Sequence, residues 1–234
     1  QNDIQLHAIS VDHGLRAGAK AELALVAELC ARLRVQHHIE VWTGWTGEGN
    51  LQSRARDARY GLITAWAKAQ GIAQVAVGHT SDDQAETVLM RLARGAGVDG
   101  LAAMAPSTQR NGIELVRPLL GSGRDELRQY LRDEGVVWAE DPSNENRDFE
   151  RIRMRDAIGI LVPFGITSES LSQVAGNMAD GRDALDHYTA MALRDACEIK
   201  HGVVAIDLET YKTLPTEIAR RVLVQAIMWI TGSV

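Results

Sequence analysis

The sequence has few cysteines and no long apolar run. Two cysteines, Cys30 and Cys197, occur among 234 residues, and they form no CxxC pair. Such spacing does not support a zinc or iron–sulfur site built from cysteines, and Cys30 is expected to be a small core residue. Because the sequence also has no secretory signal and no segment long enough to cross a bilayer, we expect a cytoplasmic protein.

Positive charge is scarce overall. The formal net charge of −6 argues against a broadly basic nucleic-acid-binding protein, because affinity for polyanions comes from lysine and arginine. Arginines nevertheless cluster at 54–59, 91–94 and 147–155, which indicates either solvated surfaces with acidic neighbours or a local basic groove. With 45% hydrophobic and 24% charged residues, the composition is that of a globular protein with a packed core.

A Walker phosphate loop is absent. The glycine-rich stretch 42–50 lacks the G-x-x-x-x-G-K-[ST] pattern and is expected to be an irregular loop. Internal repeats and low-complexity segments are absent as well.

Hydrophobic periodicity predicts alternating strands and helices. Strands are expected at residues 4–11, 35–42, 75–77, 136–138 and 203–208. Helices are expected at residues 17–33, 51–70, 82–94, 122–134, 149–160, 168–197 and 215–230. Residues 98–111 are expected to form a loop, and Pro163 and Gly165 mark a predicted domain boundary.

The same periodicity assigns side chains to helix faces. Asn50 is expected to cap helix 51–70, and Ser81 followed by Gln84 predicts a capping box for helix 82–94. The side chains expected to be buried are, for helix 51–70, Ala55, Ala58, Leu62, Ala65, Trp66 and Ala69; for helix 82–94, Ala85, Val88, Leu89 and Leu92; for helix 122–134, Leu127, Tyr130 and Leu131.

Acidic residues are concentrated where strand 75–77 meets the following helix. The segment 79–87 reads His-x-x-Asp-Asp-Gln-x-Glu-Thr, and Asp82, Asp83 and Glu86 share one helical surface. Open α/β sheets bind ligands at the carboxyl ends of their strands, so this junction is the candidate site. The alternative is that Asp82 and Asp83 only complement the positive end of the helix dipole, and the residues alone leave both readings open.

This segment resembles a conserved block of tRNA(Ile)-lysidine synthase, an adenylating enzyme family of the PP-loop ATPase superfamily of N-type ATP pyrophosphatases. Further blocks follow the family in order over roughly the first two thirds of the chain, which is more specific than any single motif. They are Val11-Asp12-His13-Gly14-Leu15-Arg16, Asn50-Leu51-Gln52 with Ala55-Arg56 and Arg59-Tyr60, Arg94-Gly95 with 97–101, Arg117-Pro118-Leu119-Leu120, and Glu140-Asp141-Pro142-Ser143-Asn144.

The resemblance implies a fold and a domain organisation. We expect an α/β fold with a Rossmann-like parallel sheet covered by helices on both faces, of the adenine nucleotide α-hydrolase type. Residues 1–164 would form the nucleotide-binding catalytic domain, and residues 165–234 part of a smaller, mainly helical domain. The family's Ser-Gly-Gly-x-Asp-Ser phosphate loop is absent from the sequence, and we expect an upstream segment to supply it.

The resemblance also implies substrates and residue roles. ATP with Mg²⁺ would activate cytidine 34 of a tRNA(Ile) with a CAU anticodon, and L-lysine would then be joined to it. The catalytic residues would be Asp83, Glu86 and Arg151, with Asp83 a possible Mg²⁺ ligand. Nucleotide contacts would come from Asp12, His13, Arg56 and His79, and tRNA or substrate contacts from Asp82, Arg91, Arg94, Asp141, Asn144 and Arg155.

Two other functions stay open at this point. One is a different PP-loop tRNA-modifying enzyme such as a thiolase, which the isolated cysteines disfavour. The other is a nucleotide-binding module without catalysis, as in electron-transfer flavoproteins, which the absent phosphate loop favours. The family usually has asparagine after the first arginine of the 149–160 helix, whereas this chain has Arg151-Ile152. The oligomeric state cannot be predicted, and a homodimer is one option.

Overall fold

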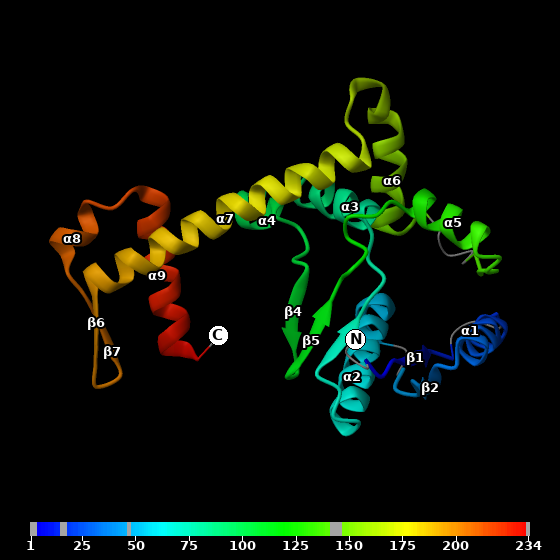
Figure 1. Ribbon diagram of the computed structural model, residues 1–234. Helices are drawn as coiled ribbons and strands as arrows, with labels where there is room; N and C mark the ends of the chain where they lie inside the picture. Colours follow the sequence, from blue (N-terminus) through cyan, green and yellow to red (C-terminus); the bar gives the residue numbers. More distant parts are fainter. Residues whose placement is uncertain (1–3, 15–17, 46–47, 141–146, 233–234) are drawn as a thin grey trace. The chain divides into compact units, whose positions relative to one another are not determined.

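The computed structural model describes residues 4–14, 18–45, 48–140 and 147–232. The chain divides into two compact units (Figure 1). Unit 1 contains residues Gln1–Glu86 and Met104–Ser172, and unit 2 contains Thr87–Ala103 and Gln173–Val234. Two helices, α3 (Ser81–Leu92) and α7 (Ser168–Ala196), contribute residues to both units. The predicted boundary between residues 164 and 165 stays a prediction.

Unit 1 holds an α/β arrangement of short strands and flanking helices. Its strands are β1 (His7–Asp12), β2 (Gln36–Val41), β3 (Gln74–Ala76), β4 (Ser107–Arg110) and β5 (Ile113–Val116). Its helices are α1 (Ala19–Leu33), α2 (Leu51–Ala69), the first half of α3 (Ser81–Leu92), α5 (Arg124–Asp133), α6 (Glu150–Leu161), the 3-10 turn η2 (Val162–Phe164) and the start of α7 (Ser168–Ala196).

Parallel pairing dominates these strands. β1 pairs with β2 from His7 opposite Gln36 to Asp12 opposite Val41, and β3 pairs with β5 in parallel. The connections between parallel strands run through helices, as right-handed crossover units require. The strands and the helices between them confirm the expected Rossmann-like α/β fold.

Helix α2 packs against β3 and β5 and carries the main core of unit 1 (Figure 1). Asn50 caps it as predicted, because its side-chain oxygen accepts a hydrogen bond from the Ser53 backbone at 3.2 Å. The predicted buried stripe is wrong, since Ala65 and Ala69 are exposed. The buried residues of the helix are Tyr60, Ile63, Thr64 and Ala67. Alanines occur on several faces of this helix, so periodicity could not identify the buried one.

Other local predictions are corrected by the structure. Residues 98–111 contain helix α4 (Val98–Leu101) and strand β4, and β4 forms an antiparallel hairpin with β5. The turn is Asn111-Gly112, with φ of 53° and 80°, which is the backbone that a two-residue hairpin needs. Residues 136–138 are not a strand, and the side chains of Leu92 and Tyr130 are exposed rather than buried.

Unit 2 is mainly helical. It contains the second half of α3, α4, most of α7, α8 (Leu208–Lys212) and α9 (Thr216–Thr231), together with the hairpin of β6 (Cys197–Lys200) and β7 (Val203–Ile206). Arg221, 8% exposed, bonds to Asp99, Asp186 and Glu217 and so joins α4, α7 and α9. Apolar contacts of Ala192, Ile218 and Val222 lie beside this ionic cluster.

No single helix in the described ranges is long and apolar enough to cross a membrane. The segments Glu150–Phe164 and Ser168–Ala196 satisfy that length and composition only when they are taken together across a bend.

The burial of α2 yields a direct test. Ala67→Gln is expected to lower the free energy of unfolding by about 2–4 kcal/mol, because it forces a larger polar side chain into a position that is 0% exposed. Ala65→Gln, on an exposed position of the same helix, is the matched control and should change it by less than about 0.5 kcal/mol. Urea unfolding followed by circular dichroism measures both, and equal losses would contradict the observed helix orientation.

Candidate active site

The turn between β3 and α3 fixes Asp83. The backbone N–H and the hydroxyl of Thr80 both donate to Asp83 Oδ2, at 2.8 and 2.9 Å, and the Asp83 N–H approaches the Thr80 hydroxyl at 3.4 Å. The helix cap therefore lies one residue before the predicted Ser81–Gln84 box, and that prediction is wrong. Gln84 instead uses its side-chain amide to bind the backbone N–H and C=O of Met104.

Glu86 lies one turn further along α3 and is almost fully buried. Its side chain is 2% exposed. Oε1 accepts hydrogen bonds from Nη1 of Arg124 at 3.1 Å and from Nε of Arg155 at 3.1 Å, with Nη2 of Arg155 at 3.0 Å. Oε2 is also buried, and within the described part of the chain it has no hydrogen-bond partner. One oxygen of this carboxylate is thus saturated, and the other is buried without a donor from the described residues.

Arg124, which the sequence did not single out, connects the acidic residues. Its Nη2 donates to Asp83 Oδ1 at 2.7 Å while Nη1 binds Glu86, and its backbone N–H donates to Asp82 Oδ2 at 2.8 Å. Arg151 lies 4.0 Å from Asp83 Oδ1. The structure therefore brings Asp82, Asp83, Glu86, Arg151 and Arg155 together and adds Arg124. We call Asp83, Glu86, Arg124, Arg151 and Arg155 the acid–arginine cluster.

Electrostatics favour the charged forms in this cluster. Burial on its own would raise the pKa of Asp83, but the hydrogen bonds from Thr80 and the charges of Arg124 and Arg151 outweigh it and hold that pKa below its ordinary value. Burial would likewise lower the pKa of Arg124, yet the facing carboxylates of Asp83 and Glu86 raise it. The cluster is thus a compensated set of charges.

His79 is neutral at physiological pH. Burial lowers its pKa to about 4, and the charges of Arg117, Arg56 and Arg151 act in the same direction, against the opposing effect of Asp83. Its buried Nδ1 has no hydrogen-bond partner among the described residues. Burial is therefore the main reason that the imidazole is neutral, and Asp83 and the three arginines act on it in opposite directions.

A second group of arginines surrounds Tyr60 on α2. The guanidinium carbons of Arg56, Arg59 and Arg110 lie 5.3, 5.3 and 4.7 Å from the centre of its ring. Of these three, Arg110 pairs with Asp57 at 2.9 Å, while Arg56 and Arg59 form no ion pair within the described ranges. Uncompensated guanidinium groups this close together favour an anion, and phosphate is the anion that arginine binds best.

Asp12 and His13 lie at the carboxyl end of β1. Asp12 accepts a hydrogen bond from the Gly14 backbone at 2.8 Å, and the His13 ring packs edge-on against Trp42 at 5.7 Å. Arg91 belongs to unit 2, where its guanidinium donates to the carbonyls of Gly100 and Ala103 at 2.6 and 3.1 Å. Arg94 is exposed in the same unit. Asp141 and Asn144 lie outside the described residues.

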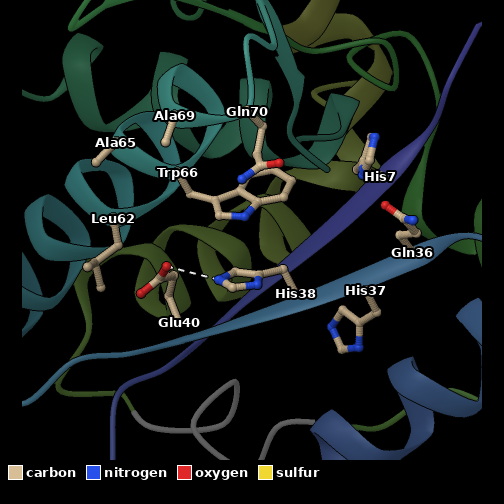
Figure 2. Close-up of a pocket in the computed structure, with 10 residues that line it drawn as sticks. All are labelled: His7, Gln36, His37, His38, Glu40, Leu62, Ala65, Trp66, Ala69 and Gln70. Atoms are coloured by element: carbon tan, nitrogen blue, oxygen red, sulfur yellow. Dashed lines mark hydrogen bonds and ion pairs between the residues drawn. The ribbon is translucent and has the colours of Figure 1, made fainter.

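A cavity of about 700 Å³ in unit 1 lies away from these residues (Figure 2). It is bounded by the C-terminal half of α2 and by β1 and β2; Trp66 stacks on His38 at 5.5 Å, and His38 pairs with Glu40 at 3.0 Å. None of the ten residues that line it belongs to the acid–arginine cluster or to the arginines around Tyr60. The candidate site therefore does not coincide with this cavity.

Comparisons with known proteins identify the family. Residues 1–161 match the family model described as the PP-loop domain. The chain is 53% identical over 232 residues to a tRNA(Ile)-lysidine synthase of Ruegeria pomeroyi, covering 99% of this chain and 55% of that protein. It is 43% identical over 210 residues to one of Mesorhizobium japonicum, covering 87% and 46%. The chain thus spans about half the length of these relatives.

A solved structure supports the fold alone. The U34-tRNA thiolase NcsA of Methanococcus maripaludis superposes with a TM-score of 0.62 at 16% identity, covering 75% of this chain and 62% of that protein. The family match covers more than half of this chain, and the two relatives align with 99% and 87% of it. The chain therefore belongs to the PP-loop family, and its resemblance to the tRNA(Ile)-lysidine synthases is confirmed.

Proposed function

We propose that the protein containing this chain is an ATP-dependent tRNA(Ile)-lysidine synthase. In this reaction O2 of cytidine 34, in a tRNA(Ile) with a CAU anticodon, attacks the α-phosphorus of ATP and releases pyrophosphate. The ε-amine of L-lysine then attacks C2 and displaces AMP, which changes codon specificity from AUG to AUA. The observation that carries the proposal is the open oxygen of buried Glu86 in a chain that is 53% identical to a lysidine synthase.

The acid–arginine cluster suits the amine. A buried oxygen without a partner costs about 1–3 kcal/mol, and an ammonium group is a strong donor that would remove this cost. Glu86 Oε2 is the proposed acceptor, and Asp83 adds negative charge one turn away. Attack requires loss of a proton from the ε-ammonium, which a carboxylate in contact with it can accept.

The arginines suit the nucleotide. Arg56 and His79 are proposed nucleotide contacts; Arg59 lies beside Arg56 at the Tyr60 ring, and Arg117 acts electrostatically on His79. Arg151, 4.0 Å from Asp83, is proposed to stabilise negative charge that develops on the α-phosphate as AMP leaves. Asp12 and His13 remain proposed nucleotide contacts from the end of β1. These residues fit the anionic part of ATP, which supplies the activating adenylyl group.

Asp83 is also the predicted ligand of Mg²⁺. In the structure both oxygens of Asp83 accept hydrogen bonds, from Thr80 and Arg124. No group of three His, Cys, Asp or Glu side chains that could hold a metal ion occurs among the described residues. A Mg²⁺ ion at Asp83 would share these oxygens with the Thr80 and Arg124 donors, so Asp83 as a metal ligand stays a prediction.

The tRNA contacts are proposed from charge and position. Arg91, Arg94, Arg155, Asp82, Asp141 and Asn144 are the proposed set, and the helical residues 165–234 are proposed to belong to a second domain that contributes to tRNA binding. Arginines can neutralise backbone phosphates despite the net charge of −6, because the favourable field is local.

The thiolase alternative gains little from the structure. Its support is the fold shared with NcsA, described with a [4Fe-4S] cluster. Clusters of this kind are held mainly by cysteine thiolates, whereas Cys30 is buried in unit 1 and Cys197 belongs to unit 2 of this chain.

Lysine transfer tests the proposed function. Protein expressed from the complete gene is incubated with radiolabelled lysine, ATP, Mg²⁺ and a tRNA(Ile) transcript bearing CAU. Label that requires ATP and cytidine 34 supports the proposal. Bound ATP without label in the tRNA would refute it and favour the non-catalytic module.

Asp83→Asn is expected to lower lysine transfer about 100-fold or more while the protein stays folded, because the variant loses the charge that faces Arg124 and Arg151. Asp125→Asn, on a fully exposed side chain of α5, is the matched control and should keep wild-type turnover. Initial rates of label incorporation measure both. Wild-type turnover in Asp83→Asn would remove this residue from the mechanism.

The neutral state of His79 predicts a pH dependence of stability. Its pKa falls from 6.5 to about 4 on folding, so the unfolded chain binds more protons between these values. The resulting stabilisation is present above about pH 6.5 and is lost as the pH falls toward 4. Between pH 7 and 5, His79→Gln should therefore lose less unfolding free energy than the wild type, by about 1 kcal/mol, because solvent screens the half-buried imidazole and reduces the effect of the full shift. Urea titrations measure this, with His187→Gln on an exposed position as control; parallel pH curves for His79→Gln and wild type would contradict it.

A further inference from the structure

We propose that Arg124 is a positioning residue of the site. Its guanidinium holds the carboxylates of Asp83 and Glu86 at one separation, so that Glu86 Oε2 stays open to the attacking amine. The proposal rests on the proposed function for the identity of the amine, but the clamp itself is a property of this chain that can be measured without catalysis.

The three cluster arginines make different contacts with the acids. Arg124 donates to Asp83 Oδ1 at 2.7 Å through one nitrogen and to Glu86 Oε1 at 3.1 Å through the other. Arg155 places Nε and Nη2 on Glu86 Oε1, and Arg151 approaches Asp83 at 4.0 Å. Arg124 is thus the arginine whose fork spans the gap between the two carboxylates.

The start of α5 is itself fixed to the start of α3. Arg124 is the first residue of α5, and its backbone N–H donates to Asp82 Oδ2 at 2.8 Å. Two residues earlier, the carbonyl of Ser122 accepts a hydrogen bond from the backbone of Ser81 at 3.0 Å. Both ends of the Arg124 residue, backbone and guanidinium, therefore contact α3, and the side chain is only 27% exposed. This anchoring restricts the guanidinium to one geometry.

The contact between Arg124 and Glu86 determines which oxygen of Glu86 lacks a donor. A terminal carboxylate torsion is soft, and an arginine facing a carboxylate prefers a bidentate fork that uses both oxygens. Arg155 alone would be free to take Glu86 in that way and so occupy Oε2. Because Arg124 pulls Oε1 toward Asp83, Arg155 contacts the same oxygen, and Oε2 is left without a donor. Removal of Arg124 is therefore expected to let Arg155 bind Glu86 Oε2, so that this oxygen can no longer accept a hydrogen bond from the amine.

Kinetics of three full-length variants test this role. Arg124→Met is expected to reduce kcat/KM for lysine about 100-fold while KM for ATP stays within about 2-fold, because a misplaced acceptor affects the amine step alone. Arg124→Lys keeps the charge but not the fork and should recover only part of the loss. Arg132→Met, on an exposed arginine of the same helix that bonds to Gln129, is the matched control and should behave as wild type.

Double-mutant cycles in urea test the clamp without catalysis. Arg124→Met is combined with Asp83→Asn and, separately, with Glu86→Gln; coupling in both cycles is expected, because one guanidinium serves both acids. Absence of coupling in either cycle overturns the clamp. If Arg124→Met does not fold, Arg124→Lys replaces it in the same cycles.

The outcomes separate this proposal from the proposed function. A wild-type protein that transfers no lysine refutes the function, while the cycles still decide the clamp. Lysine kinetics of Arg124→Met equal to those of Arg132→Met overturn the positioning role. A parallel rise in KM for ATP and lysine, unrelieved in Arg124→Lys, would show a merely structural residue and would also overturn it.

Discussion

The site depends on the burial of Glu86 beside two arginines. A carboxylate on a side chain that is 2% exposed would destabilise the fold by several kcal/mol unless positive groups compensate it. Arg124 from α5 and Arg155 from α6 supply that compensation, although they lie 38 and 69 residues away in sequence. The charge requirement therefore brings α3, α5 and α6 to one place, and the same contacts that satisfy the fold leave one oxygen of Glu86 without a partner.

Much of the architecture could be predicted from sequence because local signals agreed. Short β-branched runs bounded by glycine gave β3, and Asn50 gave the start of α2. The hairpin of β4 and β5 was missed although Asn111-Gly112 carries a recognised turn signal, because the flanking segments Ser107–Arg110 and Ile113–Val116 are short and the first is polar throughout. The prediction of the buried face of α2 was wrong because alanines made several faces of this helix equally apolar.

The site was predictable only in part for a different reason. Asp83 and Glu86 stand one turn apart on α3, and Arg151 and Arg155 one turn apart on α6, so spacing showed each pair. Spacing could not show that α6 delivers Arg155 to Glu86, or that Arg124 joins the acids, since these contacts form only when the helices pack. The one local signal for Arg124 was its place at the start of a helix. The shift of the cap to Thr80 was likewise invisible, because Thr80 and Ser81 are both acceptable caps.

Positive charge in this chain is concentrated locally. The net charge is −6, yet unit 1 places Arg56, Arg59 and Arg110 around one tyrosine, and of these Arg110 pairs with Asp57. Under the proposed function the site holds a nucleotide and an amine, which carry opposite charges, and separate positive and negative regions that meet at the reacting atoms would suit both. Arg151 and His79 lie where these regions meet, through their electrostatic contact with Asp83.

Asp83 and Glu86 therefore have different proposed roles. Asp83 accepts donors from Thr80 and Arg124 on both of its oxygens, so its geometry fixes the start of α3 and supplies charge. Glu86 has one saturated oxygen and one open oxygen, so its geometry offers an acceptor. If the amine is held by a direct hydrogen bond to an acid, the donor pattern assigns that bond to Glu86. Asp83 then acts through its charge and through the position of Arg124, which makes the arginine as much a part of the amine site as the acids themselves.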